Sequence, residues 1–184
     1  KGLAELQSEL SKSRIIQVED SQTQFLERFD ELRVSLYNGR MHILNEMMET
    51  FLNSDTLVYT DGHPKNIAVD KKGNVQFFDF GRSIKADPNF VLPNFIAHIA
   101  LMSLSGLISN GTEYMKETIK GYRESDPEYD DSLFVKYVTA EIIHRGMALR
   151  WLDQIIFDKH GAEQIKAAVA HLGDLVFDGE VTTI

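Results

Sequence analysis

Two short apolar runs separated by a turn-forming segment constrain the fold of this chain more than any other feature. The runs are Ile67–Val69 and residues 75–78, and the five residues between them read Asp-Lys-Lys-Gly-Asn. β-Branched and aromatic residues on both sides of a turn that contains Gly and Asn are typical of a β-hairpin. Leu57–Tyr59 predicts a further short strand upstream. We therefore expect a small β element in this part of the chain.

Three polar residues flank the predicted hairpin at defined spacings. Asn66 comes five residues after Asp61, and Asp79 comes thirteen residues after Asn66, as the first residue of an Asp-Phe-Gly sequence. Asn66 immediately precedes the first strand and Asp79 follows the second. Because the two strands of a hairpin are antiparallel, pairing would bring Asn66 and Asp79 to the same end of it.

Carboxylate and amide oxygens are ligands that suit Mg²⁺, and Mg²⁺ is what offsets the phosphate charge of ATP. We therefore expect Asn66 and Asp79 to hold the metal and, through it, the nucleotide. A second carboxylate that stays off the metal can orient an acceptor hydroxyl and take its proton. Asp61 is the candidate for this catalytic base. The pattern predicts phosphoryl transfer with ATP and Mg²⁺ as cofactors.

Two neighbouring residues are candidates for supporting roles. His63 lies beside Pro64 in the predicted loop, and we expect it to order the loop by hydrogen bonding rather than to transfer a proton. Lys65 could steer phosphate groups towards the site, although a solvated loop lysine is the commoner case.

The segment resembles the protein-kinase-like superfamily, and within it the aminoglycoside phosphotransferase and choline-kinase branch. That branch reads His-Gly-Asp-x-His-Pro-x-Asn and then Ile-Asp-Phe/Trp-Gly. Here residues 59–66 read Tyr-Thr-Asp-Gly-His-Pro-Lys-Asn and residues 78–81 read Phe-Asp-Phe-Gly, so that Tyr59 stands where the family usually has His. Residues 60–66 are also similar to the HipA-type serine kinases, and the Asp-x-His-Pro-x-Asn and Asp-Phe-Gly pair is similar to the UbiB-like kinases.

The resemblance implies the helical C-terminal lobe of a protein-kinase-like fold, with a catalytic loop and metal site at residues 57–83 and a helical substrate-side subdomain at residues 90–184. The sequence contains no Gly-x-Gly-x-x-Gly, and Lys1 and Lys12 are the only lysines before Asp61. We therefore expect the N-terminal nucleotide-clamping lobe to be absent from residues 1–184, and the isolated chain to be inactive.

Apolar residues at helical spacing predict that the rest of the chain is mainly helical. The expected fold class is mainly α with a small β-hairpin at the catalytic loop, that is, α+β. Two apolar stripes precede the loop, and four helices are expected after it. The stripes are Phe25, Phe29, Leu32 and Leu36, then Ile43, Leu44, Met47, Met48 and Phe51; the later helices are expected at residues 93–107, 112–122, 132–157 and 162–176.

The composition limits the partners. A length of 184 residues fits one domain. Nineteen basic residues against 28 acidic ones give a net charge of −9, which disfavours nucleic acid as a partner. The most apolar stretch, residues 90–108, is interrupted by Pro93, Asn94, His98 and Gly106. We therefore expect no membrane span. The expected location is cytoplasmic.

The distribution of charge bears on the acceptor. Residues 111–184 carry fourteen Asp or Glu residues against eight Lys or Arg residues. An acidic wall would favour a cationic small-molecule acceptor such as an amino sugar or a choline-like alcohol. A solvated acidic surface that keeps the protein soluble explains the same excess. Four residues of the predicted long helix could bind the acceptor or could pack within the protein: His144, Arg145, Arg150 and Trp151.

The leading prediction is an ATP- and Mg²⁺-dependent phosphotransferase, a kinase that acts on the hydroxyl group of a small molecule. One alternative is an atypical protein serine/threonine kinase, which the HipA-like run favours. The other is a non-catalytic kinase-like binding or regulatory module, which Tyr59 and the absent lobe favour. The presence of Asp61, Asn66 and Asp79 favours an enzyme.

Overall fold

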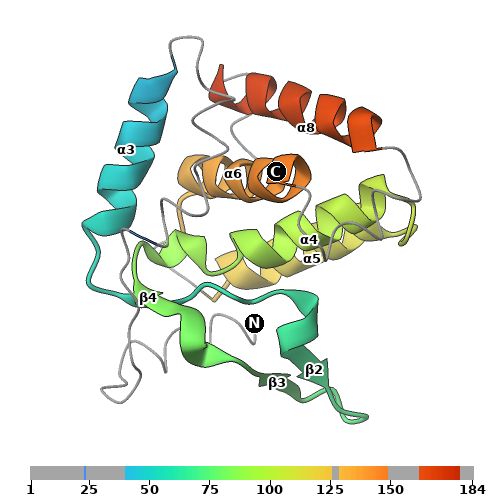
Figure 1. Ribbon diagram of the computed structural model, residues 1–184. Helices are drawn as coiled ribbons and strands as arrows, with labels where there is room; N and C mark the ends of the chain where they lie inside the picture. Colours follow the sequence, from blue (N-terminus) through green and yellow to red (C-terminus); the bar gives the residue numbers. More distant parts are fainter. Residues whose placement is uncertain (1–22, 24–39, 126–128, 149–161, 179–184) are drawn as a thin grey trace.

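The computed structural model describes residue 23 and residues 40–125, 129–148 and 162–178 (Figure 1). These residues form α-helices, two small antiparallel sheets and short 3-10 helices. The α-helices are α3 (Met41–Leu52), α4 (Pro93–Leu104), α5 (Gly111–Arg123), α6 (Asp131–Ala148) and α8 (Ala162–Phe177); the strands are β1 (Leu57–Tyr59), β2 (Ile67–Val69), β3 (Val75–Phe77) and β4 (Ser83–Lys85); the 3-10 helices are η1 (Pro64–Asn66), η2 (Phe80–Arg82) and η3 (Pro88–Phe90). The predicted class, mainly α with a small β portion, is confirmed at this level.

The two sheets have two strands each. β2 pairs with β3 as the predicted hairpin, with Ile67 opposite Phe77, and β3 ends one residue earlier than expected. β1 pairs with β4, with Tyr59 opposite Ser83. The sequence pattern does not predict β4. This second pairing matters because it brings the residue before the Asp61 loop next to the segment that follows Asp79.

The hairpin turn is built by Asp70 and Gly73. One carboxylate oxygen of Asp70 accepts hydrogen bonds from the backbone N–H groups of Lys72 (2.7 Å) and Asn74 (2.9 Å). Gly73 has a φ of +85°, a backbone conformation that suits glycine far better than other residues. These local interactions fix the register of β2 against β3, and the hairpin projects away from the helices (Figure 1).

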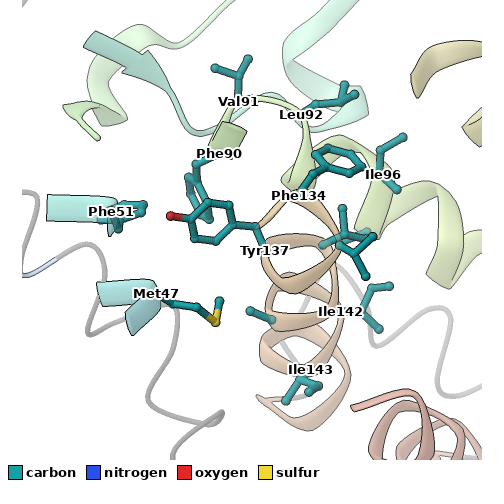
Figure 2. Close-up of a cluster of buried hydrophobic side chains, with 14 of the residues drawn as sticks. Met47, Phe51, Phe90, Val91, Leu92, Ile96, Phe134, Tyr137, Ile142 and Ile143 are labelled. Carbon is teal, nitrogen blue, oxygen red and sulfur yellow. The ribbon is translucent and has the colours of Figure 1, made fainter. Parts of the chain in front are cut away.

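Helix α6 occupies the centre of the described helices, with α4 and α8 packed against it (Figure 1) and Phe51 of α3 in contact with Tyr137. Figure 2 shows Tyr137 of α6 beside Phe51 of α3 and Phe90 of η3. The ring centroids of Phe51 and Phe90 are 5.0 Å apart, and those of Phe90 and Tyr137 are 5.3 Å apart, both in edge-to-face geometry. Such aromatic contacts add specific geometry to hydrophobic burial.

Two glycines allow α6 and α8 to pack closely. A Cβ atom added at Gly146 of α6 would come within 2.9 Å of Val169, and one added at Gly173 of α8 would come within 2.9 Å of Ile143. Both distances are shorter than ordinary carbon contacts. Small residues at these two positions therefore set the spacing between the helices.

The helix boundaries agree with the predicted ones with a few differences. α4 ends at Leu104 rather than at residue 107, because Gly106 adopts a positive φ of 68°. The predicted stripe from Phe25 to Leu36, and residues 149–157 of the long predicted helix, lie outside the described residues. Within the described part of the chain, no helix combines the length and the apolar character that a bilayer crossing requires.

Candidate functional site

Thr60 fixes the start of the loop that carries Asp61. The Thr60 hydroxyl donates a hydrogen bond to the carbonyl of Arg82 (2.6 Å), and the Thr60 carbonyl accepts one from Nδ2 of Asn94 (3.1 Å). Thr60 and Asn94 are both fully buried. The residue before Asp61 is therefore anchored on one side to the segment after Asp79 and on the other side to α4.

Asn66 lies directly against Asp61. Its Nδ2 atom donates hydrogen bonds to the backbone carbonyl of Asp61 (3.0 Å) and to Oδ2 of the Asp61 carboxylate (3.1 Å). The short helix η1 makes this contact possible, because it folds the chain back within five residues. Since the amide nitrogen of Asn66 faces Asp61, its amide oxygen remains available for another ligand.

His63 connects the loop to the same carboxylate. Its Nδ1 atom accepts a hydrogen bond from the backbone N–H of Lys65 (3.2 Å). A nitrogen that accepts carries no proton, so we assign the proton of the neutral ring to Nε2. Nε2 lies 3.8 Å from Oδ2 of Asp61. His63 thus orders the loop by hydrogen bonding, as predicted, while the side chain of Lys65 is exposed.

Asp79 has an unusual backbone conformation. With φ 55° and ψ 68° it is the one non-glycine residue with a positive φ in the described part of the chain. Asp tolerates this region better than most residues, yet such conformations cost on the order of 1 kcal/mol or more and concentrate at functional sites. The Asp79 residue is exposed, and its side chain does not cap η2. Its carboxylate is therefore accessible to a ligand.

The structure brings Asn66 and Asp79 together, as the sequence predicts. The backbone N–H of Phe78 donates to the carbonyl of Asn66 (2.9 Å), which continues the hairpin ladder one pair beyond Ile67 and Phe77. Asp79 is the next residue. Both candidate metal ligands therefore lie at the same end of the hairpin.

Tyr59 lies among all of these groups. Its hydroxyl donates to the carbonyl of Phe78 (2.5 Å). Burial raises the pKa of Tyr59 well above its ordinary value, the negative charges of Asp61 and Asp79 raise it further, and a hydrogen bond with Asn66 opposes them. Tyr59 is therefore neutral and acts as a hydrogen-bond donor. Asp61, Asn66 and Asp79 all lie within electrostatic reach of this one side chain.

The ligand set suits a metal that arrives with phosphate groups. Within residues 40–125, 129–148 and 162–178, no three His, Asp or Glu side chains gather as a metal site. The candidate site offers one carboxylate and one amide. Mg²⁺ commonly binds in this way, with one or two protein ligands, several waters and substrate phosphates completing its shell.

Two candidates on α6 are buried. Arg145 lies with Nε 3.4 Å from Oε2 of Glu141, and both side chains are almost completely buried. His144 is buried as well. These positions favour packing within the protein over contact with an acceptor.

Asn94 and His98 have roles at the site that the sequence pattern does not predict. Both residues belong to α4, and His98 packs its ring against that of His63 with a centroid distance of 5.4 Å. In the sequence they are only polar interruptions of an apolar run. No short-range spacing connects them to Asp61, because the contacts depend on where α4 packs.

No protein-family model matches the chain, and no curated protein matches it by sequence. The kinase-like resemblance therefore rests on residues 57–83. The chemistry of the site has to be inferred from the geometry of its side chains.

Proposed function

We propose that this protein is an ATP- and Mg²⁺-dependent phosphotransferase that acts on the hydroxyl group of a small molecule, and that the described residues are the helical C-terminal lobe of a protein-kinase-like fold. The observation that supports this most is that Asn66 donates a hydrogen bond to the Asp61 carboxylate, while its backbone carbonyl pairs with Phe78, the residue before Asp79. A cytoplasmic location, where ATP is available, is part of the proposal.

Asp61 is the catalytic base in this proposal. Its Oδ2 atom accepts a hydrogen bond from Asn66 and faces Nε2 of His63. Both neighbours lie at Oδ2, so Oδ1 is the oxygen that accepts a hydrogen bond from the acceptor hydroxyl. The hydroxyl proton passes to Oδ1 while the hydroxyl oxygen forms its bond to the γ-phosphorus, and the bond between that phosphorus and the β–γ bridging oxygen breaks to release ADP.

Asn66 and Asp79 hold the metal in this proposal, through the amide oxygen of the first and the carboxylate of the second. The amide nitrogen of Asn66 is engaged by Asp61, which leaves the oxygen for this role. Bound Mg²⁺ would offset the negative charge of the nucleotide phosphates. The hairpin keeps the two ligands at one end, so binding requires little rearrangement of the backbone.

A protein hydroxyl is the second candidate acceptor. Residues 60–66 read Thr-Asp-Gly-His-Pro-Lys-Asn, which resembles the corresponding run of HipA-type serine kinases. This reading uses the same roles for Asp61, Asn66 and Asp79. The acidic excess after residue 110 supports a cationic small acceptor and gives no comparable reason to prefer a peptide.

The test is transfer of the γ-phosphate of ATP by the full-length protein in the presence of Mg²⁺. Acceptors would be amino sugars, amino alcohols, neutral sugars and serine- or threonine-containing peptides. We expect phosphorylation of a small acceptor, and Asp61→Asn should lower the rate by about a hundredfold or more. Phosphorylation of peptides alone would replace the small-molecule assignment by the protein-kinase reading.

Asp55→Asn is the matched control. Asp55 lies shortly before β1, and its carboxylate pairs with Lys85 at 3.0 Å in an exposed position. Removing this charge should leave transfer unchanged, because exposed ion pairs contribute little and Asp55 lies outside the site. If no acceptor receives phosphate, or if Asp61→Asn transfers as fast as Asp55→Asn, the proposed function is wrong.

A further inference from the structure

Helix α4 contacts the catalytic loop on both sides of Asp61. Asn94 donates from Nδ2 to the carbonyl of Thr60, the residue before Asp61. His98 lies four residues later on α4, and its ring packs against that of His63 with a centroid distance of 5.4 Å and an interplanar angle of 55°. Residues four apart lie on the same face of a helix. One face of α4 therefore supports the loop before and after Asp61.

His98 acts on the loop through ring packing. It is 7% exposed, and its Nε2 atom has no hydrogen-bond partner among the described residues. The pKa of His98 is lowered to about 3, chiefly by burial; Arg145, His63 and Lys65 act in the same direction, and Glu141 opposes them. The ring is therefore neutral, and a neutral ring can pack against His63 without charge repulsion.

We propose that His98 is a positioning residue of the candidate site: its ring holds the His63 ring in the orientation in which Nε2 faces Oδ2 of Asp61. The contact itself is a property of the fold. The catalytic consequence rests on the proposed function, because it concerns the carboxylate that would act as the base.

The orientation of His63 matters because its two nitrogens have different partners. Nδ1 accepts the N–H of Lys65 at 3.2 Å, and Nε2 lies 3.8 Å from Asp61. Rotation of the His63 ring would break the hydrogen bond from Lys65 and would also move Nε2 away from Asp61. Asp61 would then keep Asn66 as the hydrogen-bond donor to Oδ2 but would lose the imidazole beside it, and its carboxylate would be less well oriented.

The first test uses the 184-residue chain with ¹⁵N-labelled histidine and no nucleotide or acceptor. Long-range ¹H–¹⁵N spectra report which ring nitrogen of each histidine carries the proton. We expect a single His63 form with its proton on Nε2. His98→Ala should convert this signal into an exchanging mixture, whereas His98→Phe should keep the single form because a ring remains in place.

Leu101→Ala is the matched control for general loosening of α4. Leu101 is fully buried on the same helix and takes no part in the loop contacts described above. The substitution Leu101→Ala removes a side-chain volume comparable to that removed by His98→Ala. We expect it to leave the His63 signal unchanged. The proposal is overturned if His98→Ala leaves the His63 form intact, or if Leu101→Ala alters it as strongly as His98→Ala does.

The second test measures phosphate transfer by the full-length protein. His98→Ala should lower kcat by about tenfold to a hundredfold with the KM for Mg²⁺–ATP unchanged, and His98→Phe should restore most of the loss. A loss confined to the KM for nucleotide would contradict a role through Asp61. If the wild-type protein transfers no phosphate, the proposed function fails, and the NMR result still decides whether His98 positions His63.

Discussion

The hydroxyl of Tyr59 donates a hydrogen bond to the backbone carbonyl of Phe78 at a distance of 2.5 Å. Tyr59 ends β1 and leads into the loop of Asp61, whereas Phe78 immediately precedes Asp79. The bond therefore joins the segment of the candidate base to the segment of the candidate metal ligand. It also gives a role to the aromatic residue that stands where the resembled kinases usually have histidine.

Tyr59→Phe should weaken this connection while keeping the ring that packs against Phe77 and Phe80. The variant loses the partly buried hydrogen bond to Phe78 and the hydrogen bond with Asn66, so the free energy of unfolding should fall by about 1 kcal/mol or more. Urea denaturation of the 184-residue chain measures this change. In the full-length protein the affinity for Mg²⁺–ATP should also fall, because the segment before Asp79 is held less firmly.

Tyr122→Phe is the control for this prediction. The Tyr122 hydroxyl also donates to a backbone carbonyl, that of Pro88, at 3.3 Å, and the side chain is buried. Its removal should lower stability by a similar or smaller amount and leave nucleotide affinity unchanged. Equal losses of nucleotide affinity in the two variants would show that stability alone, and not the link to Asp79, is responsible.

Stability should depend on pH through His98. Its pKa is about 3 in the folded protein and near 6.5 when the chain is unfolded, so below pH 6.5 the unfolded chain binds more protons. The contribution of neutral His98 to the free energy of unfolding is therefore fully present above pH 6.5 and is lost as the pH falls towards 3. Between pH 7.5 and pH 5 this group should remove about 2 kcal/mol from the free energy of unfolding.

His98→Phe isolates this contribution, because phenylalanine fills the same site without titrating. Urea denaturation at pH 7.5 and pH 5 should show a smaller loss in the variant than in the wild-type chain. The same loss in both proteins would mean that other groups cause the pH dependence. Arg145, His63 and Lys65 also lower the pKa of His98 and Glu141 raises it, so these residues contribute to the shift that the variant removes.

The hairpin turn should tolerate asparagine better than alanine at position 73. Gly73 has a φ of +85° and no atom within 4 Å of an added Cβ, so a substitution there is opposed by backbone conformation and not by a clash. Gly73→Ala should lower the free energy of unfolding by about 1 kcal/mol, and Gly73→Asn by less. Thermal and urea denaturation of both variants would contradict this if alanine were harmless or asparagine were the worse of the two.

The parts of the fold that the sequence predicted are those with local causes. The β2–β3 hairpin follows from the turn around Asp70 and Gly73, and the convergence of Asn66 and Asp79 follows from its antiparallel pairing. β4 was missed because its three residues carry no alternating pattern of their own and become a strand only by pairing with β1.

The supporting contacts of the site were missed for a similar reason. Asn94 and His98 reach the Asp61 loop across more than thirty residues of sequence, through the packing of α4. His98 interrupts an apolar run in the sequence, and only the structure shows that its polar ring is buried against another histidine. Residues whose role depends on tertiary packing leave no periodic signal.

The most direct test of the division of roles is calorimetric titration of Mg²⁺–ATP into the full-length protein and two variants. Asp79→Asn should lower the affinity by at least about tenfold, because an amide is a poorer ligand than a carboxylate for Mg²⁺. Asp61→Asn should bind Mg²⁺–ATP nearly as well as the wild-type protein, because Asp61 is assigned to the acceptor and not to the metal. Equal losses in the two variants, or full affinity in Asp79→Asn, would contradict the account.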